Sequence, residues 1–95
     1  MVTVEVFYVV NDNPKTINPA SGKLFEGIWC QRNGYQVKTL KEATPYFNRR
    51  TAQNLIDRLV KNNGMVCPDW ARVAKNTKAS MGKYRIVSGT IQVKV

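Results

Sequence analysis

The side chains in this 95-residue sequence that could do chemistry are mostly cations, and they lack the partners that catalysis needs. Histidine is absent, which removes the usual general base, a common zinc ligand and any Ser-His or Cys-His pair. Cys30 and Cys67 are too far apart for a Cys-x-x-Cys site, and no phosphate-binding glycine loop or Ca²⁺ loop occurs. We therefore expect a protein that is not an enzyme and that uses no metal and no cofactor.

The positive charge is large and unevenly distributed. Fifteen Lys and Arg residues against six Asp and Glu residues give a net charge of +9. Residues 1–47 contribute only +1 of this excess, and residues 48–95 contribute +8. A localised excess of this size attracts polyanions, so the second half of the chain is expected to carry the binding surface.

The first candidate group lies on the polar side of a predicted helix. Its members are Arg49, Arg50, Arg58 and Lys61. Asp57 is the one acidic residue in that stretch, and the paired arginines stand near the backbone N–H groups of a helix start, which suit a phosphate. The alternative is an ordinary solvated helix face.

The second candidate group follows Asp69, after which the sequence has no acidic residue. Its members are Arg72, Lys75, Lys78, Lys83, Arg85 and Lys94. The lysines flank a polar segment with Asn76 and Ser80 that is suited to wrapping a phosphate backbone. Taken one at a time, these residues are unremarkable surface cations.

Trp29 and Lys38 form the third candidate. On the open face of a sheet, this tryptophan would stack on a base or anchor a protein interface. The alternatives are burial under a loop or under the first strand, or a surface cation–π pair with Lys38.

Local sequence signals place these residues on strands and one helix. Residues 2–10 are rich in β-branched and aromatic types and predict a strand. Asn33-Gly34 predicts a two-residue type I′ turn between strands at 24–32 and 35–40, which sets Cys30 opposite Val37 and Trp29 opposite Lys38.

A helical period follows the hairpin and ends at Lys61. Its apolar stripe is Ala52, Leu55, Ile56, Leu59 and Val60. Asn48 is the expected N-cap, with Thr44 before Pro45 as an alternative earlier start, and residues 62–64 are the expected stop signal. Residues 83–87 and 90–95, around Ser88-Gly89, predict either a hairpin or one strand with a glycine bulge. Together these signals predict one α+β domain over residues 1–95, with a single antiparallel sheet of four or five strands and one amphipathic helix packed on one face.

The sequence contains no long apolar run and no leader-like start, so we expect a cytoplasmic protein without membrane association. In that compartment Cys30 and Cys67 are expected to be free thiols.

The run Thr-Pro-Tyr-Phe-Asn-Arg-Arg-Thr-Ala-Gln-Asn-Leu-Ile at 44–56 follows strands and opens an amphipathic helix, with Phe47 and Ala52 separated by four residues. In outline it resembles the sheet-then-helix DNA-binding modules of plant transcription factors and phage integrase arms. That resemblance implies a sheet laid in a major groove. Integrase-type modules usually carry arginines on the strands themselves. The strands before this helix offer only two central cations, Arg32 and Lys38. In size and lack of motifs the chain is also similar to small phage-encoded accessory proteins, including anti-CRISPR proteins.

These observations lead to two hypotheses about partners. The first is a non-enzymatic domain that binds DNA or RNA through phosphate contacts of the two basic groups. The second is an inhibitor or adaptor of phage type that binds a host protein or nucleoprotein through an aromatic-centred interface around Trp29. The sequence does not choose an oligomeric state.

Overall fold

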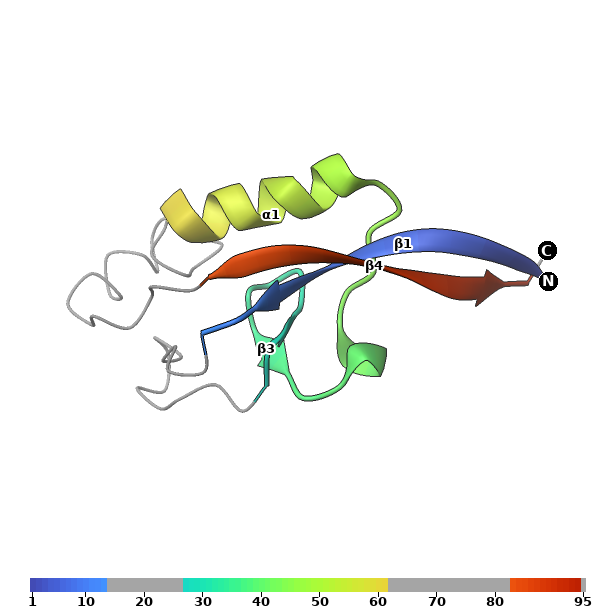
Figure 1. The fold of residues 1–95 in the computed structure, drawn as a ribbon, viewed down its shortest axis with the longest axis horizontal. Coiled ribbons are helices and arrows are strands. Elements are labelled where there is room, and N and C mark those ends of the chain that lie inside the picture. Colours follow the sequence, from blue (N-terminus) through green and yellow to red (C-terminus); the bar gives the residue numbers. More distant parts are fainter. Residues whose placement is uncertain (14–26, 62–82, 95) are drawn as a thin grey trace.

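The computed structural model of the chain describes residues 1–13, 27–61 and 83–94. Within these ranges it is an α+β fold, a single four-stranded antiparallel sheet in the order β3-β2-β1-β4 with helix α1 over one face (Figure 1). The predicted fold class is confirmed. Several predicted features lie outside the described residues: Arg72, Lys75, Lys78, Cys67, Trp70 and the helix stop signal at 62–64.

The two long strands, β1 and β4, pair along their whole length. β1 (Val2–Asn11) and β4 (Tyr84–Val93) pair antiparallel without interruption, from Val2 opposite Val93 to Asn11 opposite Tyr84. Of the two alternatives expected at Ser88-Gly89, the single strand is confirmed, but its continuous register contains no glycine bulge. A Cβ atom added at Gly89 would lie 3.1 Å from Cε2 of Tyr8, so the glycine gives this ring room on the sheet.

The structure confirms the hairpin before the helix, but the register of its two strands differs from the predicted register. β2 (Trp29–Cys30) and β3 (Gln36–Val37) pair with Trp29 opposite Val37 and Cys30 opposite Gln36. Gln31 N donates to Tyr35 O over 2.8 Å, and Gly34, with φ of 89°, donates to Gln31 O over 2.9 Å. The loop therefore has three residues and ends in a left-handed glycine, which shifts β3 by one residue and reverses its faces.

Helix α1 (Arg49–Lys61) begins where the sequence predicts. The side-chain oxygen of Asn48 accepts hydrogen bonds from Arg50 N over 2.7 Å and Thr51 N over 3.3 Å, which is the arrangement of an N-cap. Ala52, Leu55 and Leu59 are buried, but Val60 is 63% exposed. The apolar stripe is thus narrower than predicted, because Val60 lies beyond the edge of the helix–sheet contact.

Apolar clusters occupy both faces of the sheet. The helix-side cluster contains Val9, Cys30, Tyr46, Ala52, Leu55 and Leu59. The opposite cluster contains Val6, Tyr8 and Ala43, with Trp29, Val37, Val87 and Ile91 packed against it. β1 supplies both because its side chains alternate between faces. Figure 1 shows α1 and the 3₁₀ turn η1 (Leu40–Glu42) on opposite sides of the β1–β4 ribbon.

No helix within the described ranges has the length and apolar character needed to cross a bilayer.

Candidate nucleic-acid interface

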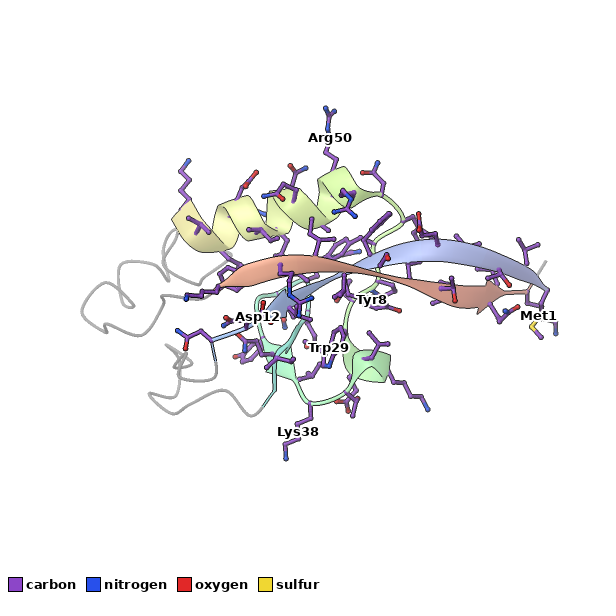
Figure 2. The ribbon with its side chains drawn as sticks, in the orientation of Figure 1. Met1, Tyr8, Asp12, Trp29, Lys38 and Arg50 are labelled. Atoms are coloured by element: carbon purple, nitrogen blue, oxygen red, sulfur yellow. The ribbon has the colours of Figure 1, made fainter. Side chains whose placement is uncertain are left out.

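The four cations of α1 are all exposed, yet they do not form one face. At about 100° per residue, Arg50 and Lys61 point directly away from the buried stripe, whereas Arg49 and Arg58 lie on opposite flanks of the helix. Figure 2 shows Arg50 projecting away from the sheet. The predicted helix group is therefore divided into an outward sector and two flanks.

Arg49 is engaged within the fold. Its Cζ atom lies 5.2 Å from the ring centroid of Phe7, in cation–π geometry. The two N–H groups that Asn48 caps are also occupied, which corrects the expectation that the helix start offers free donors to a phosphate. The Arg49 side chain therefore packs α1 against the sheet.

The charge of Arg58, on the other flank, and that of Arg32, from the β2–β3 loop, both act on the hydroxyl of Tyr46. Tyr46 is 4% exposed, and its hydroxyl oxygen has no hydrogen-bond partner among the described residues. Burial raises the pKa of Tyr46, while the positive charges of Arg32 and Arg58 act in the opposite direction. The Arg32 side chain also lowers this pKa as a donor, although it does not reach the hydroxyl oxygen in hydrogen-bond geometry.

Backbone contacts hold the β2–β3 loop in this position. Arg32 N donates to Thr44 Oγ1 over 2.9 Å, and Gln31 Nε2 donates to Glu42 O over 3.0 Å. Gln31, Arg32, Asn33 and Thr44 line a shallow depression of about 320 Å³. The loop thus presents Arg32 from a surface that is fastened to the segment before α1.

We call Arg32, Arg50, Arg58 and Lys61 the basic surface. Asp57 is the acid nearest to it along the helix, and its carboxylate accepts a hydrogen bond from Gln53 Nε2 over 3.0 Å. In the described part of the chain, no carboxylate lies within ion-pairing distance of Arg32 or Arg58. Arg32 was not predicted as a phosphate contact, because the position of its loop relative to Tyr46 depends on how the hairpin docks.

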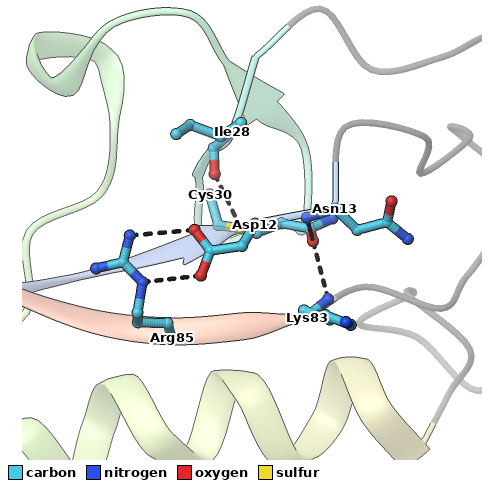
Figure 3. Close-up of polar contacts among 7 residues, drawn as sticks. Asp12, Asn13, Ile28, Cys30, Lys83 and Arg85 are labelled. Carbon is cyan, nitrogen blue, oxygen red and sulfur yellow. Dashed lines mark hydrogen bonds and ion pairs between the residues drawn. The ribbon is translucent and has the colours of Figure 1, made fainter.

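Arg85 belongs to the other face of the sheet. It stands opposite Val10 in the register and forms a two-pronged ion pair with Asp12, at 2.8 Å from Nε and 3.1 Å from Nη2 (Figure 3). The hydrogen bond from Arg85 lowers the pKa of Asp12 below its usual value. Arg85 was expected to have no acid nearby, but the fold supplies one from β1's end.

Lys83 lies immediately before β4, where its backbone forms hydrogen bonds with the end of β1. Its N–H donates to Asn11 Oδ1 over 3.0 Å, and its carbonyl accepts from Asp12 N over 2.8 Å. Lys83 itself is exposed. It stays a candidate cation away from the basic surface.

Trp29 does not stand on an open sheet face. It is half-buried, and its ring packs edge-on against Tyr8 with centroids 6.1 Å apart and an interplanar angle of 83°. It lies opposite Val37, not Lys38 as the predicted register required. Figure 2 shows Trp29 near Tyr8 and Lys38 pointing away from the sheet. The tryptophan therefore serves the second apolar cluster, one of the alternatives that the sequence left open.

A different aromatic is exposed near the helix start. Phe47, immediately before the N-cap, is 65% exposed. Its sequence signal was the spacing to Ala52, which gave no indication of exposure. It is available for stacking beside the arginines that follow it.

No protein-family model, curated protein or solved structure matches this chain. Within the described ranges, no three His, Cys, Asp or Glu side chains gather as metal ligands. Fold and site therefore define the class by themselves: a small α+β domain with a basic surface made by one helix and one hairpin loop.

Proposed function

We propose that this protein binds nucleic acid through phosphate contacts of the basic surface, without catalysis. The carrying observation is that the cations of the basic surface are exposed, and that no ion pair of Arg32 or Arg58 occurs within the described residues. Guanidinium groups that no carboxylate of the described residues neutralises attract an anion such as a phosphate. Their planar donor forks also match the geometry of phosphate oxygens.

The outward cations extend this contact along the helix. Arg50 and Lys61 are solvent-exposed on the side of α1 that faces away from the sheet. Phosphate contacts carry no sequence information, so the binding is expected to be largely independent of sequence. Arg72, Lys75 and Lys78 are proposed as further phosphate contacts from outside the described residues.

The expected salt dependence follows from the number of phosphates contacted. Each neutralised phosphate of duplex DNA contributes about −0.9 to the slope of log K against log salt, so the basic surface alone implies a slope of about −3 to −4. Contacts from residues 72–78 would steepen it. Arg85 should add little, because Asp12 already neutralises it.

A matched pair of charge reversals tests where binding occurs. Arg58→Glu removes one cation of the basic surface, and Lys41→Glu makes the same change in net charge at an exposed position elsewhere. Titration of labelled duplex DNA, single-stranded DNA and RNA at two salt concentrations should show at least a tenfold larger loss for the first variant.

Two results would contradict the proposal. Equal losses in the two variants would mean that only net charge matters and that the basic surface is not a site. Failure of the unmodified protein to bind any nucleic acid at low salt would instead assign the charge to an acidic protein partner, as the inhibitor or adaptor hypothesis requires.

A further inference from the structure

Within the described residues, β4 is an edge strand of the sheet. In the order β3-β2-β1-β4, no strand of the described residues lies beyond it. The run from Ile86 to Val93 contains no charged residue and no proline, and its uninterrupted register with β1 leaves no bulge. Natural edge strands usually carry one of these devices to prevent pairing. Their absence along this run indicates an edge that pairs with another strand.

The hydrogen bonds of β1 show which groups of β4 face outward. Asn11 N donates to Ile28 O, and Phe7 exchanges two hydrogen bonds with Tyr46, so the odd-numbered residues of β1 bond away from β4. Asp12 N donates to Lys83 O, which confirms the alternation. By register, the N–H and C=O groups of Ile86, Ser88, Thr90 and Gln92 point to the free edge.

We propose that β4 pairs antiparallel with β4 of a second copy of this chain, about a two-fold axis at Gly89. Gly89 is the middle of the segment from Tyr84 to Lys94, so this register uses the whole strand. Ser88 then stands opposite Thr90, and Ile86 opposite Gln92, with their outward backbone groups matched. Gly89 faces its own copy in the narrow, non-hydrogen-bonded type of pair.

Side-chain chemistry favours a second copy in this register. Val87 of one copy stands opposite Ile91 of the other, on the face of the second apolar cluster, where both are only half-buried in the single chain. Arg85 stands opposite Val93, and Lys94 opposite Tyr84. No two cations face each other directly, although the chain is strongly basic.

The two-fold axis at Gly89 stands perpendicular to the sheet and places both α1 helices on the same face of one continuous sheet. The dimer would therefore present two basic surfaces to one nucleic acid, and this statement about binding rests on the proposed function. The dimer itself rests only on β4.

Substitutions at two exposed positions of β4 test the proposed register of the dimer. Ser88→Lys with Thr90→Lys sets like charges opposite each other across the axis, and so does Ser88→Glu with Thr90→Glu. Ser88→Lys with Thr90→Glu sets opposite charges face to face. Sedimentation equilibrium, with circular dichroism to confirm folding, should show a dimer for the unmodified chain. We expect dimerisation to weaken at least tenfold in both like-charge variants and to stay within about threefold in the mixed one.

The design separates register from net charge. The double glutamate variant lowers the positive charge and would strengthen association if only overall repulsion mattered. A monomer at every concentration of the unmodified chain would overturn the proposal, and so would equal weakening in all three variants.

Salt distinguishes this proposal from nucleic-acid binding. Raising the salt from about 0.1 M to about 1 M screens the repulsion between two basic chains, so the dimer should strengthen or hold. Nucleic-acid binding should weaken steeply over the same range. The two proposals can therefore fail independently.

Discussion

At the residue scale, the buried hydroxyl of Tyr46 is the unusual group. Burying a hydroxyl without a hydrogen bond opposes folding by about 1–3 kcal/mol, because the group leaves water and gains no partner. The ring of Tyr46, by contrast, is part of the helix-side cluster. The residue is therefore stabilising through its ring and destabilising through its oxygen.

Removing that oxygen should not weaken the fold. We expect Tyr46→Phe to leave the free energy of unfolding unchanged or to raise it by about 1 kcal/mol, whereas Tyr46→Ala should lower it by about 3–5 kcal/mol. Urea denaturation measures both. A loss of more than about 1 kcal/mol in Tyr46→Phe would show that the hydroxyl has a real partner.

Cys30 and Tyr84 make the fold sensitive to alkali. Burial raises the pKa of the Cys30 thiol from 9.0 to about 12 and is the main reason that the pKa of Tyr84 rises from 10.0 to about 12. Above pH 9 the unfolded chain loses a proton that the folded chain retains, so stability falls as pH rises. The stabilising contribution is fully present below that pH.

Unfolding free energies between pH 8 and pH 11 should therefore decline by up to about 1.4 kcal/mol per pH unit for each group. In Cys30→Ala the decline should begin near pH 10, where Tyr84 starts to titrate, in place of pH 9. The difference in onset is the readout, because the substitution also lowers stability at every pH. An unchanged onset would mean that the thiol is accessible to solvent.

At the scale of elements, the sequence predicted each element that the structure describes except the turn η1. The helix position follows from the Asn48 cap and the apolar period, which are local. The hairpin register was wrong by one residue because Asn33-Gly34 is compatible with both two- and three-residue loops, and only Gly34 takes a special conformation here. Local turn chemistry could not choose between them.

β4 shows a second limit of prediction from the sequence. Ser88-Gly89 looked like a break, but a glycine within a strand also serves close packing, and Tyr8 lies against it. The sequence cannot reveal which strand will cover a glycine. For the same reason the sequence did not indicate the Asp12–Arg85 ion pair, whose members come from elements far apart in the chain.

Buried Asn11 explains how these distant elements are joined. Its Oδ1 accepts from the backbone N–H groups of Asn13 and Lys83, both over 3.0 Å, and its Nδ2 donates to Gln36 Oε1 over 3.0 Å. One polar side chain therefore links the end of β1, the start of β4 and β3. A satisfied buried amide of this kind favours one register over its neighbours.

At the scale of the whole molecule, β1 couples the two faces of the sheet. Val9 belongs to the helix-side cluster, while Val6 and Tyr8 belong to the other. Neither cluster can lose its packing without exposing side chains of the same strand. A domain of this size with a shared central strand should unfold as one unit.

Two probes on opposite faces can test this coupling. In a Trp70→Phe background the fluorescence of Trp29 reports the second cluster, and the far-ultraviolet dichroism of α1 reports the first. Leu59→Ala, on the helix side, should cost about 2–5 kcal/mol and move both transitions to the same lower urea concentration. If the helix signal shifts while the Trp29 transition stays in place, the two faces unfold separately and β1 does not couple them.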